Sequence, residues 1–316
     1  MTLHNGSFRF LIPRGRLFQP ICRYLSVMGI VLGEPDRCGY CGCMEAAGWT
    51  IEFWARKPSM IPTLLAQEKA QTVFHAGLTG EDMLLESGVE SLKKIAALSF
   101  SSRSLKPTKW VLAGPVWDLE SAQEGSSRLR PKMLPKEQER PVTIGCEWLG
   151  LAKKLLQKSS ISHLQVELVH LHGNEESAVY NGLCEWIICP METGESLEMN
   201  RMASRQKLMD SHPCILARFD LCQYQRTILD GIVSVLEAAD TAAQRAMVTF
   251  DIPVGKIAHI VFPEYVISST HLPLLKDGWE AGAVCINRAD LITVLPKLKQ
   301  AGARAIVVSD IQAFID

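Results

Sequence analysis

Short apolar runs alternate with stretches of helical periodicity along most of the chain. Residues 8–12 (FRFLI) predict a strand closed by Pro13, and residues 17–28 carry apolar side chains at helical spacing. Further strands are expected at residues 51–54, 73–76, 110–113, 142–146, 164–169 and 186–189. Helices are expected from Pro62, over residues 148–157 and over residues 173–183. Strands alternating with helices predict mostly parallel sheets covered on both faces.

One polar segment interrupts this alternation. Residues 116–141 are rich in proline and charge and show no period, so we expect an exposed loop. The interruption predicts two α/β lobes. Ligands in such folds bind at the carboxyl ends of strands. Glycine- or hydroxyl-bearing turns are expected at three such ends, at residues 13–16, 77–82 and 192–196.

The last third of the chain has a different order of elements. A long helix is expected over residues 228–239, with further helices over residues 255–262 and 289–300. Strands are expected at residues 246–250, near 270–275 after a turn near 268–273, and at 281–286 and 305–308. The order βαββαβ predicts a ferredoxin-like domain. Such a domain indicates regulation or, equally, oligomerisation.

Composition narrows the class of protein. The chain has 316 residues, 47% of them hydrophobic, and a formal net charge of −1. A net charge so close to zero does not predict the basic surface that is typical of nucleic-acid-binding proteins. No apolar run reaches the roughly 18 residues of a membrane helix. The N-terminal residues lack a secretion signal, so we expect a cytoplasmic protein.

The cysteines divide into two groups. Seven of them (Cys22, Cys146, Cys184, Cys189, Cys214, Cys222 and Cys285) lie mostly in apolar patterns, typical of buried small hydrophobes. Cys38, Cys41 and Cys43 form a C-x2-C-x-C cluster. A zinc or iron–sulfur site would need a fourth ligand, and no second close pair is present. We therefore favour reduced surface thiols for this cluster.

The stretch METGESLEMN, residues 191–200, combines features of a phosphate loop with negative charge. Thr193 and Ser196 flank Gly194 at the start of an expected helix, where backbone N–H groups bind anions. Glu192 is expected to face ribose hydroxyls or a Mg²⁺-bound water. Glu195 and Glu198 are expected on the solvent side of the helix start.

Several stretches, taken in order, resemble the long form of the ATP phosphoribosyltransferase family. They are FLIPRGRLFQPICRYLSVMGI, KPSMIPTLLAQ, GLTGEDMLLESG, TIGCEWLGLAKKLL with Glu147, HGNEESAVYNGLCEWIICPMETGESLEMNRM, SSTHLPLLKDGWEAGAVCIN and LKQAGARAIVV. The resemblance implies a two-lobed, periplasmic-binding-protein-like catalytic core and a C-terminal ferredoxin-like (ACT-like) regulatory domain. It implies a first lobe of residues 1–112 and 206–225, a second lobe of residues 113–205 and a regulatory domain of residues 226–316.

The resemblance also implies a reaction. N1 of ATP is joined to C1 of phosphoribosyl pyrophosphate, and pyrophosphate leaves, as the first step of histidine biosynthesis. Mg²⁺ is expected on the pyrophosphate, without a dedicated protein cage. Histidine and AMP are candidate inhibitors, and a homo-oligomer from dimer to hexamer is expected.

Site residues follow from the matching motifs. The phosphoribosyl-pyrophosphate site is expected to comprise Glu192, Thr193, Gly194, Glu195, Ser196 and Leu197. The ATP site is expected to comprise Arg14, Arg16, Lys57, Thr79 and Gly80, with Arg56 as a weaker candidate. Arg16, Glu192 and Thr193 are the expected catalytic residues. Ser269 and Thr270 are expected to help bind the inhibitor. Asp82 is a candidate helix cap, and His75, His163, His170 and His172 are expected to be ordinary half-buried histidines.

Three positions depart from the family pattern. Met60, His75 and Cys189 stand where the family has aspartates, and we expect these changes to cluster in the cleft. They favour an alternative function, a catalytically impaired relative that binds a nucleotide or phosphosugar as a sensor or regulatory subunit. An extracytoplasmic solute-binding protein is disfavoured by the missing signal and the added C-terminal domain.

Overall fold

The chain forms two compact units. The computed structural model describes residues 6–27, 29–46, 48–67, 72–99, 107–116, 141–173, 175–260, 262, 268–274 and 277–315. Unit 1 comprises Met1–Ile21 and Leu32–Leu229, and unit 2 comprises Cys22–Val31 and Asp230–Asp316. The expected loop at residues 116–141 lies almost entirely outside the described residues. Within the described part, no helix is both long and apolar enough to span a membrane.

The first lobe of unit 1 is built on a six-stranded sheet of order β2-β3-β1-β4-β11-β5. Its strands are β1 (Gly6–Pro13), β2 (Tyr40–Ala46), β3 (Trp49–Arg56), β4 (Ala76–Gly80), β5 (Leu92–Ala97) and β11 (Pro213–Arg218). Strand β1 pairs in parallel with β3 and β4. Phe10, Leu11 and Ile12 are successive and fully buried, as expected for a parallel strand covered on both faces. Its helices are η1 (Pro58–Met60), α2 (Ile61–Ala66) and α3 (Glu81–Ser87), whereas helix α1 (Phe18–Val27) is divided between the two units.

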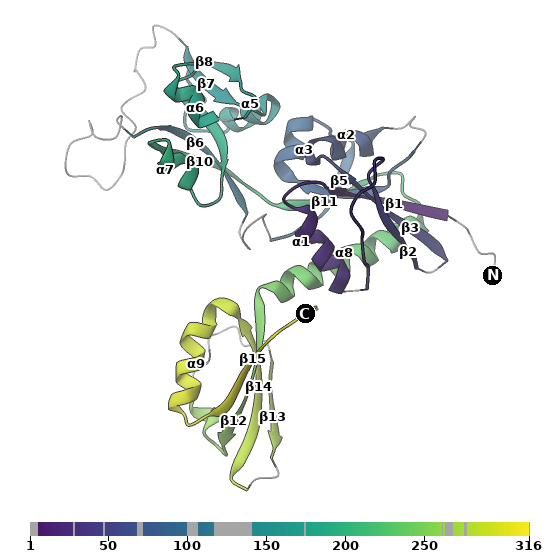
Figure 1. The fold of residues 1–316 in the computed structure, drawn as a ribbon, viewed down its shortest axis with the longest axis vertical. Helices are drawn as coiled ribbons and strands as arrows, with labels where there is room; N and C mark the ends of the chain where they lie inside the picture. The colour runs from purple at the N-terminus through teal and green to yellow at the C-terminus, as the bar shows by residue number, and fades with distance from the viewer. Residues whose placement is uncertain are drawn as a thin grey trace. The chain divides into compact units, whose positions relative to one another are not determined.

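The second lobe has a five-stranded sheet of order β10-β6-β9-β7-β8 (Figure 1). Its strands are β6 (Thr108–Pro115), β7 (Val142–Cys146), β8 (Val166–His170), β9 (Trp186–Met191) and β10 (Met202–Ser211). Its helices are α5 (Leu149–Gln157), α6 (Glu175–Tyr180) and α7 (Glu195–Met199). Trp110 and Ile144 belong to one buried cluster and Val111 and Ile187 to another, because alternate residues of a strand face opposite sides of the sheet.

The chain crosses between the lobes twice. Strands β6 and β10 pair antiparallel from Thr108–Ser211 to Pro115–Met202, so both strands lie whole in the second sheet. The return crossing is the single residue His212, because β11 starts at Pro213 and pairs with β4. These crossings differ from the expected boundaries, which placed residues 108–112 and 206–211 in the first lobe. In Figure 1 the green strand β11 accordingly lies among the purple and blue strands of the first lobe.

The position of strand β4 differs from the expected positions of a strand and a turn in this part of the chain. We expected a strand at residues 73–76 and a turn at 77–82, whereas Ala76–Gly80 is the strand and α3 begins at Glu81. Gly77 is buried in the core. A Cβ added at this position would lie 2.7 Å from the Cβ of Leu11, which is too close. This glycine therefore permits close strand packing rather than a turn.

Unit 2 is a four-stranded antiparallel sheet of order β13-β14-β12-β15. Its elements are β12 (Arg245–Pro253), η2 (Ile257–His259), β13 (Ser268–Pro273), β14 (Trp279–Asn287), η3 (Arg288–Asp290), α9 (Leu291–Gln300) and β15 (Arg304–Asp310). This strand order confirms the ferredoxin-like plan. The helix expected at residues 255–262 is wrong: within the described residues, only the short 3-10 helix η2 forms there. The turn expected near 268–273 is strand β13. The long helix α8 (Gln223–Ala243) runs from unit 1 into unit 2.

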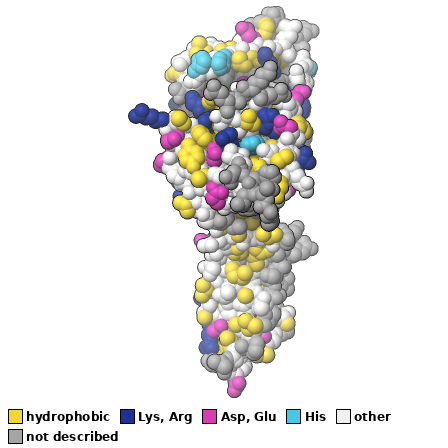
Figure 2. Space-filling model, turned by 90° about the vertical axis from the view of Figure 1, so that its right-hand side faces the viewer, with side chains coloured by type: hydrophobic (Ala, Val, Ile, Leu, Met, Phe, Trp, Pro, Cys, Tyr) yellow, Lys and Arg dark blue, Asp and Glu magenta, His cyan; other side chains and the backbone are white. Residues whose placement is uncertain are grey.

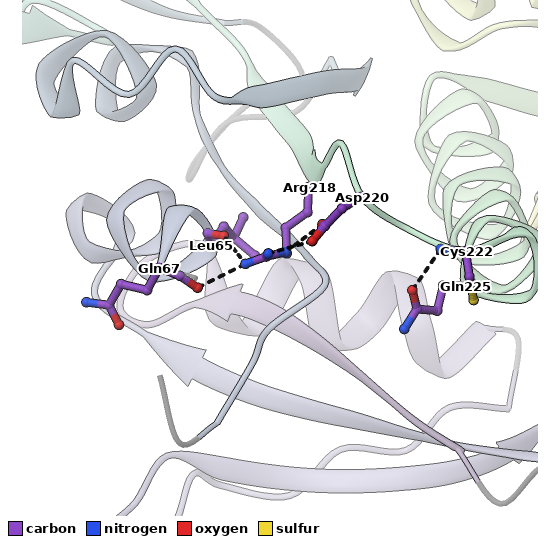
Figure 3. Close-up of polar contacts among 6 residues, drawn as sticks. All are labelled: Leu65, Gln67, Arg218, Asp220, Cys222 and Gln225. Carbon is purple, nitrogen blue, oxygen red and sulfur yellow. Dashed lines mark hydrogen bonds and ion pairs between the residues drawn. The ribbon is translucent and has the colours of Figure 1, made fainter. Parts of the chain in front are cut away.

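Arg218, the last residue of β11, joins three segments of the first lobe (Figure 3). Its Nη1 donates to the carbonyl oxygens of Leu65 at 3.3 Å and Gln67 at 2.9 Å, at the end of α2. Its Nε and Nη2 donate to the two carboxylate oxygens of Asp220 at 2.8 and 2.7 Å. Close by, the N–H of Cys222 donates to Oε1 of Gln225 at 3.0 Å, before α8 begins. Arg218 therefore fixes the ends of α2 and β11 together.

Replacing Arg218 by alanine should lower the free energy of unfolding by about 2 kcal/mol, because two carbonyl groups lose a charged donor. The Arg218 side chain is only 13% exposed, whereas that of Asp220 is 65% exposed. Asp220→Asn should therefore cost much less, since solvent screens exposed charge pairs. Urea denaturation followed by circular dichroism measures both variants. Equal losses would contradict the role assigned to the carbonyl contacts.

Candidate functional site

A cavity of about 480 Å³ lies between the two lobes of unit 1. It is lined by Leu17, Lys57, Pro58, Ser59, Gly80, Asp82, Met83, Thr108, Glu147, Trp148, Ser211, His212 and Pro213. Four of these residues stand at carboxyl ends of strands: Lys57 follows β3, Gly80 ends β4, Glu147 follows β7 and Ser211 ends β10. The cavity thus lies where ligands are expected in α/β folds, at the carboxyl ends of strands. The crossing residue His212 forms part of its wall.

The first-lobe wall is held by a hydrogen bond between strand β4 and the short helix η1. Thr79 is fully buried, and its Oγ1 donates to the carbonyl oxygen of Pro58 at 2.9 Å. Gly80 leaves room for the carboxylate of Asp82, because a Cβ at Gly80 would lie 2.1 Å from Asp82 Oδ1. Thr79 therefore ties β4 to η1, and Gly80 accommodates the Asp82 carboxylate in the cavity wall.

Asp82 connects the wall to the second lobe. Its Oδ2 accepts a hydrogen bond from Nε1 of Trp110 at 3.0 Å, and its Oδ1 accepts from the N–H of Met83 at 2.9 Å. Its own N–H donates to Oγ of the buried Ser211 at 3.2 Å. The expectation of a simple helix cap was incomplete, since the N-cap position of α3 is Gly80. The carboxylate instead bridges the lobes.

Glu81 holds the return crossing. Its N–H donates to the carbonyl oxygen of His212 at 3.0 Å, and its Oε2 accepts from the N–H of His212 at 3.1 Å. Its Oε1 accepts a short hydrogen bond from Nζ of Lys94, and this bond raises the pKa of Lys94. Both backbone groups of the crossing residue are therefore fixed by one residue of α3.

The residues expected to bind ATP fall into three groups. Lys57 and Gly80 line the cavity, and Thr79 lies buried behind it. Arg14 and Arg16 are exposed, do not line the cavity, and follow β1. The guanidinium of Arg14 donates to the carbonyl oxygen of Asp36 at 3.2 Å.

Arg56, the weaker candidate, is engaged elsewhere. Its guanidinium lies over the rings of Trp54 and Phe74, at 5.5 and 5.7 Å from the ring centroids. Burial and the nearby Arg14 lower its pKa. It does not line the cavity.

The expected phosphate loop lies at the end of β9, apart from the cavity lining. Gly194 has φ +90°, which favours glycine, and caps the five-residue helix α7. The Oγ of Ser196 donates to Oε1 of Glu176 at 2.5 Å, so one nearby glutamate is a partner of the loop. Glu192 is half-buried, Thr193 and Glu195 are exposed, and Leu197 is buried in the lobe core. None of residues 192–197, all of them described, lines this cavity.

The three replaced positions do not cluster in the cleft, contrary to expectation. Neither Met60, His75 nor Cys189 lines the cavity. Cys189 is 3% exposed inside β9, and burial raises the pKa of its thiol. The Nδ1 of His75 accepts a hydrogen bond from the N–H of Arg9 at 3.0 Å. Burial lowers the pKa of His75 to about 4, with Arg9 adding to the effect.

Sequence reasoning missed several wall residues. His212 lies in none of the matching stretches, and Trp148 and Ser59 lie in such stretches but were not singled out. Thr108 starts β6, which was expected to begin at residue 110. One usable signal was present in MDSHPCIL, residues 209–216, where Pro213 separates two apolar patterns. Proline is tolerated at the first residue of a strand, and Pro213 is the first residue of β11.

The cysteine cluster offers no metal site in the described residues. No group of three or more His, Cys, Asp or Glu there could hold a metal ion. Cys38 and Cys43 are exposed, but Cys41 is buried in β2, so the expectation of surface thiols is wrong for Cys41. Burial raises the pKa of its thiol.

Surface charge is mixed on the face shown in Figure 2. Basic and acidic side chains are interspersed over the upper part of that view, without a field of one sign. This distribution agrees with the formal net charge of −1.

The Ser269 and Thr270 positions lie in β13. Their backbones pair with Val284 and Ala283 of β14. Thr270 is exposed, and the side chain of Ser269 lies outside what the structure describes.

Comparisons with family models and with known proteins indicate the same family over most of the chain. The family model described as ATP phosphoribosyltransferase (HisG) matches residues 57–238, and that of the HisG C-terminal domain matches residues 242–313. An ATP phosphoribosyltransferase of Sulfolobus acidocaldarius is 25% identical over 309 residues, covering 96% of this chain and 97% of the relative. That of Desulfosudis oleivorans is 25% identical, covering 83% and 90%.

A solved structure of the HisG:HisZ ATP phosphoribosyl transferase complex from Thermotoga maritima has the same fold. It matches with a TM-score of 0.53 at 20% identity, covering 73% of this chain and 98% of that chain. The family models together span most of the sequence, including the cavity wall from Lys57 to Pro213 and the ferredoxin-like domain. The chain therefore belongs to the ATP phosphoribosyltransferase family, a family of pentosyltransferase enzymes.

Proposed function

We propose that this protein joins N1 of ATP to C1 of phosphoribosyl pyrophosphate with release of pyrophosphate, the first step of histidine biosynthesis. The observation that carries the proposal is the interlobe cavity, which lies at strand ends inside the region matched by the family model. ATP is assigned to this cavity. Lys57 supplies a cation for its phosphates, and Gly80 forms part of the wall beside it.

The phosphoribosyl group is assigned to the loop of residues 192–197. Gly194 in the left-handed region turns the chain sharply after β9, and Thr193 and Ser196 add hydroxyl groups to the turn. Glu192 is assigned to the ribose hydroxyls. The assignment requires the lobes to bring this loop and the cavity together around the two substrates, a common form of lobe closure.

The reaction is one of positioning and charge stabilisation. The bond from C1 to pyrophosphate breaks as N1 of adenine approaches, so negative charge grows on the leaving group. Arg16 is assigned to that charge, because a guanidinium donates two parallel hydrogen bonds to phosphate. Mg²⁺ supplies charge neutralisation when bound. Since no cluster of three ligands exists in the described residues, we assign the ion mainly to substrate phosphate oxygens.

Pyrophosphate release with ATP, phosphoribosyl pyrophosphate and Mg²⁺ tests the proposal. Lys57→Ala should raise the KM for ATP on the order of tenfold, since a charged hydrogen bond to phosphate contributes about 1.5–3 kcal/mol. Lys93, exposed on β5 and outside the cavity, provides the matched control. Absence of turnover by the wild-type protein would refute the proposed reaction.

A catalytically impaired relative is the second candidate. It is favoured by Met60, His75 and Cys189, which replace aspartates of the family pattern. The two candidates give different results in one experiment. If both substrates raise the Tm without pyrophosphate release, the protein is a binding subunit, because ligands of the native state stabilise it.

Feedback inhibition is part of the proposal for the C-terminal domain. Histidine is assigned to a site near Ser269 and Thr270 of β13. AMP is assigned as a competitor for the ATP cavity, and assembly to a dimer or hexamer is expected. Adding histidine to the turnover assay should lower the rate of the wild-type protein, and Thr270→Val should weaken that inhibition.

A further inference from the structure

Helix α5 of the second lobe lacks a capping side chain of its own. Its N-cap residue is Trp148, which makes no side-chain cap hydrogen bond. The first N–H groups of a helix have no partner within the helix. The sequence therefore leaves the start of α5 without the Ser, Thr, Asp or Asn that usually satisfies these donors.

The missing cap comes from the other lobe. Oε2 of Glu86, on α3, accepts a hydrogen bond from the N–H of Leu151 at 2.6 Å. Leu151 is the third residue of α5, the position that an N-cap side chain normally satisfies. A carboxylate is also favoured there by the helix dipole. Glu86 thus acts as an N-cap for a helix in the opposite lobe.

A second contact makes this arrangement reciprocal. Nζ of Lys154, on α5, donates to the carbonyl oxygen of Leu85 near the end of α3 at 2.7 Å. Each helix therefore satisfies a terminal backbone group of the other. Leu85 also packs against the hydrophobic cluster of the second lobe.

Glycine at position 150 allows this close approach. A Cβ on Gly150 would lie 2.8 Å from the carbonyl oxygen of Glu86 and 3.0 Å from its Oε2. Any larger residue would push α5 away from α3. The helix pair is therefore set at a distance that only glycine permits.

The same two helices begin at the cavity. Asp82 and Met83 of α3 line one wall, and Glu147 and Trp148, directly before α5, line the other. We propose that Glu86 is a positioning residue, which fixes the separation of these two cavity walls by capping α5 from the opposite lobe. This inference rests on the proposed function where it concerns ATP. Glu86 does not line the cavity and acts through α5.

Hydrogen exchange tests the cap without any substrate. In the wild-type protein the amide of Leu151 should exchange slowly. Glu86→Ala should increase its exchange rate at least tenfold, because the acceptor is lost. Glu86→Gln keeps an acceptor oxygen and should restore most of the protection. Glu90, exposed four residues further on, provides the control: Glu90→Ala should exchange as the wild type does. Equal protection of Leu151 in the wild type and Glu86→Ala would overturn the cap.

Binding and turnover test the positioning. Titration calorimetry with Mg-ATP should give a Kd about tenfold higher for Glu86→Ala than for the wild type, since displaced walls lose their alignment. Glu86→Gln should recover most of that loss, and Gly150→Ala should reproduce it with Glu86 intact. An unchanged Kd in Glu86→Ala and Gly150→Ala would overturn the positioning role. Failure of the wild type to bind ATP would instead refute the proposed function. The hydrogen-exchange experiment would still show whether Glu86 caps α5.

Discussion

Replacing Trp110 by alanine should lower the free energy of unfolding by about 3–5 kcal/mol, the range found for large aromatic residues truncated in cores. Trp110 is 1% exposed and is the largest of the fully buried side chains. It lies in β6, paired with Met209 on one side and Pro190 on the other. Its loss would leave a cavity in the main cluster of the second lobe.

A second effect adds to the cavity. Nε1 of Trp110 donates to Oδ2 of Asp82, so the substitution also removes the donor to that oxygen, while Oδ1 keeps its hydrogen bond from the N–H of Met83. Trp110→Phe keeps a six-membered aromatic ring but loses the five-membered part of the indole with its N–H, so it should cost less than Trp110→Ala, about 1–3 kcal/mol. Urea denaturation followed by circular dichroism measures both variants. A loss below about 1 kcal/mol for Trp110→Ala would show that the second-lobe core is not organised around this ring.

Stability should fall as the pH is lowered from 6.5 to 4, because His75 is held neutral in the folded state. Burial is the main cause that lowers its pKa from 6.5 to about 4, and the positive charges of Arg9 and Arg218 act in the same direction. Within this interval the unfolded chain binds a proton that the folded chain does not. The free energy of unfolding therefore rises with pH between these values and is independent of His75 above 6.5.

The complete effect of His75 is at most about 3 kcal/mol, and solvent screening of the partly exposed ring reduces it. His75→Asn should flatten the dependence of unfolding free energy on pH between 4 and 6.5. His163, which is exposed, provides the control, and His163→Asn should leave the slope as in the wild type. Denaturation with urea at a series of pH values measures all three proteins. The same slope in His75→Asn and the wild type would contradict the assignment.

Strands with a strong local pattern were predictable in this chain. The run FRFLI lies in β1, residues 142–146 are β7, and the order of strands after residue 245 is ferredoxin-like, as expected. These elements follow from hydrophobic period and from prolines near their ends. Local sequence predicts a turn at a glycine even where the glycine is needed for close packing inside a strand. Gly77 was placed in a turn but is in the core, because its contact is with Leu11, far away in sequence.

The site was only partly predictable. Lys57 and Gly80 were expected near nucleotide and line the cavity, whereas Arg14 and Arg16 do not. The wall formed by Trp148 and His212 depends on a crossing between two sheets, which no local pattern specifies. Glu86 gave no signal, because its role exists only where α3 meets the uncapped start of α5.

The sequence by itself determined the family, the alternation of strands and helices, and the small antiparallel domain at the end of the chain. These features depend on residues close together in the chain, where period and turn chemistry act. Only the tertiary structure decided which side chains share the interlobe cavity. That choice depends on the register of β10 and β11 and on the contact between α3 and α5, which join residues more than 60 positions apart in the chain.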